Sequence, residues 1–147
     1  MYQNGAKQYQ KVNGTSEALD ADPHRLIQLL LEAALTRLAQ AKGAIERHDM
    51  PTKANLLGRV TEIIQTLQAS LNVEAGGEVA RNLENLYDYM VRRVLQATAH
   101  NDISMLEEVM KLLLEIKVGW DGIRKEYLAS QNPASADQSA VATAAHF

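Results

Sequence analysis

The feature that most constrains this chain is a series of long segments in which apolar residues recur every three or four positions, the spacing of one helix face. In the segment 23–47 these residues cover roughly 240° of the helix circumference, whereas a core-facing stripe needs little more than ~100°. They are Leu26, Ile27, Leu29, Leu30, Leu31, Ala34, Leu35, Leu38, Ala41 and Ile45. We therefore expect this helix to contact more than its own bundle, as in a protein that binds another apolar chain.

Four such segments follow one another and predict an all-α fold. The first begins after Asp22, which can cap a helix, has Pro23 in its first turn and ends near His48. The others are expected at about residues 53–72, 78–99 and 103–128. Gly76 and Gly77 are expected to lie in the connection before the third helix. Helices of this length with short connections pack as antiparallel neighbours, so the prediction is an antiparallel four-helix bundle.

The segments on either side of the bundle have a different composition. We expect residues 22–129 to form the bundle, residues 1–21 a mobile N-terminal arm or cap, and residues 130–147 a disordered tail of small and polar residues. Tyr9 is an aromatic residue within the polar arm. Two interpretations of it stay open: a chance aromatic residue in a mobile arm, or a plug that covers an apolar groove until a partner binds.

The first and fourth helices are the predicted walls of such a groove. In the fourth helix the main apolar face includes Leu106, Trp120 and Tyr127, whereas Leu114 and Val118 lie about 100° or more from its centre. These two residues form a second apolar ridge. The candidate groove residues are Ile27, Leu31, Leu35, Leu114 and Val118.

The sequence argues against an enzyme and predicts no catalytic, cofactor-binding or metal-binding residues. It has no cysteine, no Glu-x-x-His pair of the kind that holds two metal ions in a bundle, and no glycine-rich phosphate loop. The four histidines are more than twenty residues apart, near helix ends or in the tail, where we expect capping or solvent-exposed roles. They are His24, His48, His100 and His146.

Charge and hydropathy indicate the compartment and the classes of partner. A net charge of −3, from 15 basic and 18 acidic residues, argues against nucleic-acid binding. The longest apolar stretch, Leu26 to Leu38, is interrupted by polar residues and is too polar for membrane insertion. The N-terminus lacks the apolar core of a secretion signal, and a cytoplasmic protein is therefore expected.

Several short motifs, in order, resemble the FliS family of flagellar export chaperones. The motifs are Ala6-Lys-Gln-Tyr9-Gln, Asp22-Pro23-His24-Arg25-Leu26-Ile27, Gly76-Gly77-Glu78, Asn82-Leu83, Leu86-Tyr87-Asp88-Tyr89-Met90 and Trp120. The resemblance runs from about Tyr9 to Ile123. One departure is Leu30-Leu31-Glu32-Ala33, where the family usually has Leu-Tyr-Asp-Gly.

The resemblance implies a fold and a function. Members of this family are antiparallel four-helix bundles with an N-terminal segment that can cap an apolar surface. They bind the disordered C-terminal region of flagellin in the cytoplasm, prevent its premature polymerisation and assist its delivery to the flagellar type III export apparatus. Whether the chaperone itself contacts the export gate stays open. The alternative function is a structural homodimer, in which the wide faces of the first and fourth helices bury each other.

Overall fold

The computed structural model describes residues 20–131 of the 147-residue chain, and within that range it is helical without strands. The helices are α3 (Pro23–Glu46), α4 (Met50–Ala69), α5 (Val73–His100), α6 (Ile103–Gly122) and α7 (Arg124–Ser130). The predicted all-α fold is confirmed. The N-terminal arm and the tail fall largely outside the described residues, so the division into segments 1–21, 22–129 and 130–147 stays a prediction.

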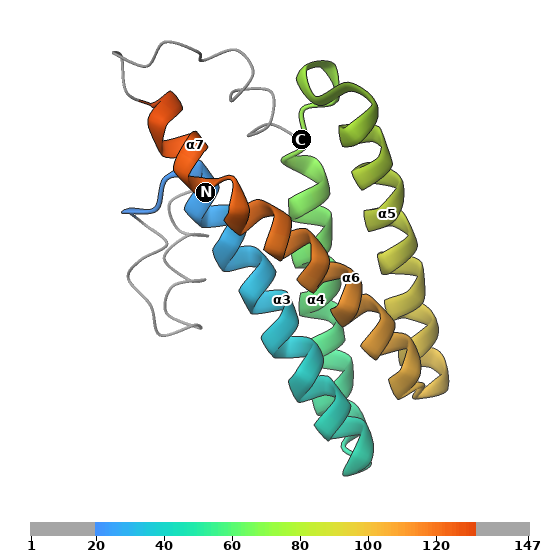
Figure 1. Ribbon diagram of the computed structural model, residues 1–147. Coiled ribbons are helices and arrows are strands. Elements are labelled where there is room, and N and C mark those ends of the chain that lie inside the picture. The colour runs from blue at the N-terminus through green and yellow to red at the C-terminus, as the bar shows by residue number, and fades with distance from the viewer. Residues whose placement is uncertain (1–19, 132–147) are drawn as a thin grey trace, which may run out of the picture.

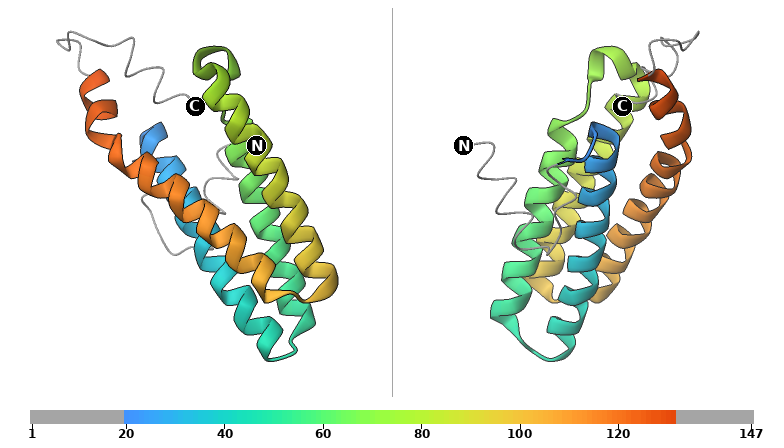
Figure 2. Two further views of the ribbon diagram at one scale, coloured as in Figure 1. Left: turned by 45° about the vertical axis from the view of Figure 1, so that its right-hand side comes forward. Right: turned by 90° about the vertical axis from the view of Figure 1, so that its left-hand side faces the viewer.

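The four long helices form one antiparallel bundle (Figure 1). Helices α3 and α5 each pack against both α4 and α6, so every long helix has two neighbours and the core lies between all four. The short helix α7 follows α6 and continues past the start of α3, as the two views of Figure 2 show. The bundle therefore has an end at which α7 adds a further wall.

The helix starts are fixed by side chains that accept hydrogen bonds from otherwise unpaired backbone amides. Asp22 Oδ1 accepts from Arg25 N at 2.7 Å, and Pro23 occupies the first turn, as predicted. Asn72 caps α5 and Asp102 caps α6 in the same way. These caps place the breaks between helices at defined residues.

Two helix boundaries differ from those that we predicted. Helix α5 begins at Val73 and continues through a kink at Gly77, where φ is 57° and ψ is −129°. Residues with a side chain rarely adopt this backbone conformation, and glycine adopts it without steric cost. The predicted fourth helix, 103–128, is divided at Ile123 into α6 and α7.

The wide apolar face of α3 is mostly buried within the bundle, contrary to our expectation of a large exposed surplus. Its core residues include Leu31, Ala34, Leu38 and Ala41, all without solvent exposure. Among the described residues, the large apolar side chains that are exposed lie on other helices. They are Val79 and Leu95 on α5, Leu114 and Val118 on α6, and Leu128 on α7.

One end of the bundle is closed by polar contacts. Here α3 and α5 end and α4 and α6 begin, and we call it the closed end. The buried Lys53 donates from Nζ to Thr98 O at 2.9 Å and to Asn101 Oδ1 at 2.7 Å. The lysine thus satisfies carbonyl groups at the C-terminus of α5, where a positive charge also complements the helix dipole.

Candidate functional site

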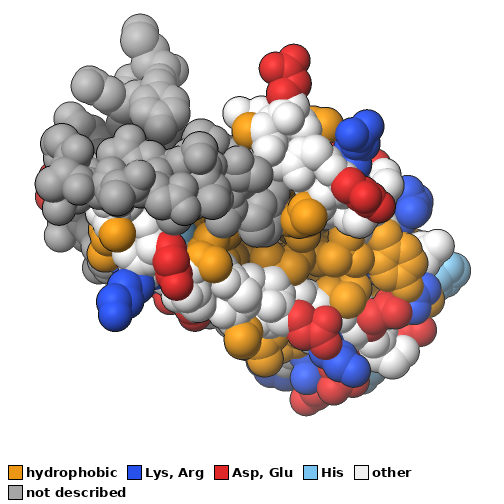
Figure 3. Space-filling model, turned by 45° about the horizontal axis from the view of Figure 1, so that its top comes forward, with side chains coloured by type: hydrophobic (Ala, Val, Ile, Leu, Met, Phe, Trp, Pro, Cys, Tyr) orange, Lys and Arg blue, Asp and Glu red, His pale blue; other side chains and the backbone are white. Residues whose placement is uncertain are grey.

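The opposite end of the bundle contains an apolar pocket of about 730 Å³. We call this the open end; α3, α5 and α7 begin here, and α4 and α6 finish here. Its lining includes His24 and Ile27 from α3, Val79, Leu83 and Tyr87 from α5, Ile116 and Trp120 from α6, and Tyr127 from α7. On the face shown in Figure 3, hydrophobic side chains gather in a hollow with charged side chains along its sides. A concave apolar surface of this kind suits the binding of another apolar chain.

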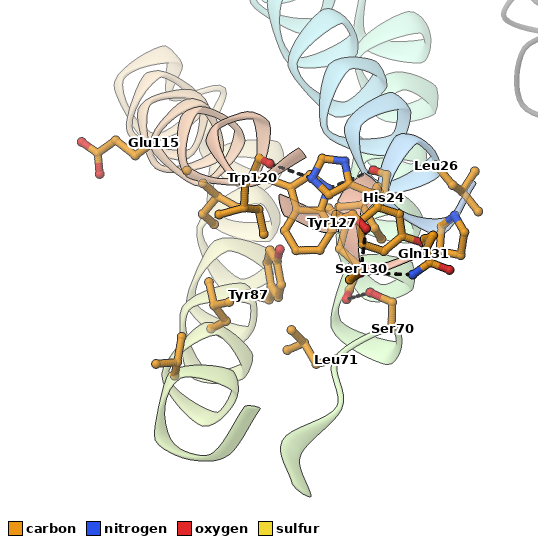
Figure 4. A pocket seen from close by; sticks show the side chains of 18 residues that line it. His24, Leu26, Ser70, Leu71, Tyr87, Glu115, Trp120, Tyr127, Ser130 and Gln131 are labelled. Carbon is orange, nitrogen blue, oxygen red and sulfur yellow. Dashed lines mark hydrogen bonds between the residues drawn. The ribbon is translucent and has the colours of Figure 1, made fainter. Parts of the chain in front are cut away.

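One wall of the pocket is a stack of three rings. The His24 ring lies 4.5 Å from the Trp120 ring at an interplanar angle of 8°, and 5.2 Å from the Tyr127 ring (Figure 4). Trp120 Nε1 donates to His24 O at 2.9 Å, and His24 Nε2 lies 2.7 Å from Trp120 O. The start of α3 is thereby joined to the end of α6.

Arg124 joins α7 to the same wall and determines which nitrogen of His24 carries the proton. Its Nη1 and Nη2 donate to the two carboxylate oxygens of Asp22 at 3.2 and 2.9 Å. Its Nη1 also lies 3.1 Å from His24 Nδ1. Because a guanidinium group only donates, Nδ1 must accept, and the proton of the neutral ring is then on Nε2, which donates to Trp120 O. All polar atoms of the ring are satisfied in the neutral form.

The electrostatics of this wall favour neutral His24. Burial lowers the pKa of His24, and the charge of Arg124 lowers it further. The hydrogen bond to Trp120 O and the charges of Asp22 and Asp121 raise the pKa, but by less. The hydrogen bond from Arg124 lowers the pKa of Asp22. The Asp22–Arg124 pair therefore stays charged while the imidazole between the helices stays neutral.

The burial of His24 corrects our prediction of a capping or solvent-exposed role for it. Its side chain has no solvent exposure. The position at the start of α3 suggested exposure, but α7 crosses that start and covers it with Tyr127. His48 and His100 are exposed, and His146 lies outside the described residues.

Tyr87 forms the floor of the pocket, and Tyr89 lies elsewhere. Tyr87 is 3% exposed, and burial raises its pKa to about 12. Its side chain belongs to the buried core of the bundle. Tyr89 is half-buried, and its hydroxyl lies 2.9 Å from both carboxylate oxygens of Glu108, which also accepts from Arg93 Nε at 2.7 Å.

The structure separates the five predicted groove residues. Ile27 lines the pocket, and Leu35 is half-buried against the core. Leu114 and Val118 are 53% and 65% exposed; they lie outside the pocket lining, and we call them the α6 ridge. The placement of Leu31 in an exposed groove is wrong, because its side chain is 0% exposed and lies in the middle of the bundle core. The predicted plug residue, Tyr9, lies outside the described residues.

Sequence reasoning missed the contribution of α5 to the pocket. Val79, Leu83 and Tyr87 line it from one face of α5, at the four-residue spacing that places side chains one above another. This spacing was visible in the sequence and indicated a buried face. The spacing does not show that Val79 is half-exposed. The exposure of Val79 depends on how far α5 lies from α6 and α7 at the open end.

The described residues offer little for metal chemistry or membrane insertion. Within residues 20–131, no group of three or more histidine or acidic side chains is placed to hold a metal ion. The helices in this range are also too short or too polar to cross a bilayer.

Comparison with known proteins gives the family. Residues 5–127 match the family model described as flagellar protein FliS. The chain belongs to the FliS family of flagellar export chaperones. It is 53% identical over 117 residues to flagellar secretion chaperone FliSB of Pseudomonas aeruginosa, a match that covers 80% of this chain and 93% of the relative.

Two further relatives carry the name flagellar secretion chaperone FliS. The Vibrio cholerae protein is 41% identical over 119 residues, which is 81% of this chain and 88% of the relative. The Salmonella typhimurium protein is 41% identical over 121 residues, which is 82% of this chain and 90% of the relative. These matches confirm the resemblance that the motifs indicated.

Proposed function

We propose that this FliS-family chain binds the disordered C-terminal region of flagellin in the open-end pocket. It does so in the cytoplasm, prevents premature polymerisation, and assists delivery of flagellin to the flagellar type III export apparatus. The observation that carries this proposal is the apolar pocket of about 730 Å³ in a bundle whose family consists of flagellar export chaperones.

The pocket suits an amphipathic helix better than a small polar ligand. The pocket lining includes four aliphatic side chains from three different helices: Ile27, Val79, Leu83 and Ile116. An apolar helix laid into such a groove is held by side chains at three- and four-residue spacing. The bound segment would replace water over apolar surface, at roughly 25 cal/mol per Å².

The mechanism follows from the client's own tendency to assemble. Flagellin's terminal helices have apolar faces that seek neighbours in the filament, and the pocket offers those faces a substitute surface. Ordering a disordered segment costs of order 2–5 kcal/mol of the interaction energy. That cost keeps the complex reversible, which a chaperone needs because it must release its client.

We expect two further elements to take part in binding. The α6 ridge of Leu114 and Val118 offers a second exposed apolar surface, outside the pocket lining. Tyr9 is the proposed plug of the unoccupied site. Deletion of residues 1–10 should then tighten flagellin binding, whereas weaker binding would make the arm part of the binding site.

A matched pair of substitutions on α5 tests the pocket. Val79 lines the pocket at 49% exposure, and Leu95 on the same helix is 57% exposed outside it. Val79→Asp should weaken flagellin co-purification at least about tenfold, since a buried unpaired carboxylate costs several kcal/mol. Leu95→Asp should leave it unchanged, and both variants should keep the helical circular-dichroism signal. Equal binding by both variants would contradict the pocket assignment.

The homodimer remains the second candidate, because the α6 ridge is exposed in the single chain. Two ridges could bury each other in an isologous contact. Light scattering on the isolated protein separates the candidates. A dimer that Leu114→Asp dissociates, together with no affinity for flagellin, would favour the structural role.

A further inference from the structure

We propose that the Tyr87 hydroxyl selects the segment that the pocket accepts, by hydrogen bonding to an uncharged polar side chain on the segment's otherwise apolar face. The partner side chain would be Asn, Gln, Ser or Thr. This inference rests on the proposed function, since it names the chemistry that the client must carry. It makes Tyr87 the specificity-determining residue of the pocket.

The first observation is that the Tyr87 hydroxyl has no hydrogen-bond partner among the residues that the structure describes, although the side chain is nearly fully buried. The side chain lines the pocket, and its hydroxyl points to the part of the pocket where Trp120 lies (Figure 4). Folded proteins pair nearly all buried polar groups, and an unpaired one lowers stability. The Tyr87 hydroxyl is therefore available to form a hydrogen bond with a segment that binds in the pocket.

The second observation is the contrast with Tyr89, two residues along α5. Its hydroxyl donates to the carboxylate of Glu108, which Arg93 also holds. The same helix thus carries Tyr89, which is hydrogen bonded near the surface, and Tyr87, whose hydroxyl has no partner within residues 20–131. Packing alone would be served as well by phenylalanine at position 87, so the hydroxyl needs another explanation.

The surroundings of Tyr87 favour an uncharged partner. The described residues that line the pocket include one carboxylate, the exposed Glu115, and no lysine or arginine. Arg124, which lies behind the wall, is already bonded to Asp22 and His24. A carboxylate or ammonium group brought to Tyr87 would lose its hydration without gaining an opposite charge. An amide or hydroxyl loses less and can bond with the phenol, which is protonated at neutral pH.

The decisive experiment compares Tyr87→Phe with Tyr89→Phe. For each variant, calorimetry measures the affinity for the C-terminal segment of the flagellin encoded in the same genome, and denaturant titration measures stability without it. We expect Tyr87→Phe to bind about three- to tenfold more weakly, the effect of one buried neutral hydrogen bond. Its unfolding midpoint should be unchanged or higher, because it removes an unpaired hydroxyl. Tyr89→Phe should show the reverse: unchanged affinity and a lower midpoint.

The partner side chain follows from a scan of the flagellin segment, with each Asn, Gln, Ser and Thr replaced by Ala. One replacement should weaken binding to the wild-type protein as much as Tyr87→Phe does, and should cause no further loss with that variant. If the wild-type protein binds the flagellin segment and Tyr87→Phe binds it with the same affinity, this inference is overturned and the proposed function stands. A lower midpoint for Tyr87→Phe would overturn it too, because the hydroxyl would then be paired in the free protein. Absence of wild-type binding would contradict the proposed function itself.

Discussion

The two ends of this bundle differ in how completely their side chains are packed. At the closed end, four helix termini meet, Leu57, Val94 and Leu106 are buried, and Lys53 satisfies the carbonyl groups at the end of α5. At the open end, α5 kinks at Gly77, α7 crosses the start of α3, and an apolar pocket remains between them.

The difference shows where stability and binding are located in this fold. Side chains at the closed end have their partners within the chain, so changes there should alter stability without changing what the protein binds. At the open end, Ile27, Val79 and Leu83 are only partly covered, and their energetics depend on what occupies the pocket. Substitutions in the core, at the closed end and at the open end test whether stability and binding can be separated in this way.

The largest expected effect is that of shortening a core side chain. Leu31→Ala should lower the free energy of unfolding by about 2–5 kcal/mol, because it leaves a cavity in a fully buried site. Leu114→Ala on the exposed α6 ridge should change it by less than about 0.5 kcal/mol. Urea denaturation measures both. Similar losses for the two variants would mean that the ridge is covered in solution.

The next effect concerns the closed end. Lys53→Met keeps the aliphatic stem but removes the donor to Thr98 O and Asn101 Oδ1. Stability should fall by about 1–3 kcal/mol, the cost of leaving buried acceptors unpaired, and affinity for flagellin should stay within twofold of wild type. A strong loss of binding by this folded variant would show that the two ends are coupled.

A smaller effect concerns acid pH at the open end. Because the folded protein lowers the pKa of His24 from its ordinary 6.5, the unfolded chain binds the proton more readily. The stabilisation from neutral His24 is thus complete above pH 6.5 and is lost as the pH falls from there to the lower folded pKa. Each unit of pKa difference is worth about 1.4 kcal/mol.

Denaturation between pH 7.5 and 5 measures this loss, and fluorescence of Trp120, the only tryptophan in the chain, reports the titration of the stacked ring. His24→Gln should flatten the fluorescence titration, while His100→Gln, at an exposed site, should leave it as in wild type. A titration that persists in His24→Gln would assign the signal to another group.

The sequence predicted the bundle because its signals are local. Asp22 followed by Pro23 starts a helix whatever the rest of the chain does, and the three- and four-residue spacing of Leu83, Tyr87 and Met90 defines a helix face on its own. The division at Ile123 was missed because the apolar spacing continues through it to Tyr127, so that no local signal marks the break.

The pocket could be predicted only in part because it depends on contacts between distant segments. The wide apolar face of α3 led us to expect contacts beyond the bundle, whereas the bundle's own helices cover most of that face, Leu31 included. His24 is buried by Trp120 and Tyr127, which lie about a hundred residues away in the sequence, and the three rings together form one wall of the pocket. Helical periodicity gives the direction of a side chain, whereas exposure depends on tertiary packing.

Amide hydrogen exchange, measured with and without the C-terminal segment of flagellin, locates the binding surface on the bundle directly. We expect binding to slow exchange at the open end, in the first half of α5 around Val79 and Leu83 and in α7 around Tyr127. Amides at the closed end, around Lys53 and Thr98, should keep their rates. If flagellin binds tightly but slows exchange only at the closed end or along the α6 ridge, with no change around the pocket, the pocket is not its binding site.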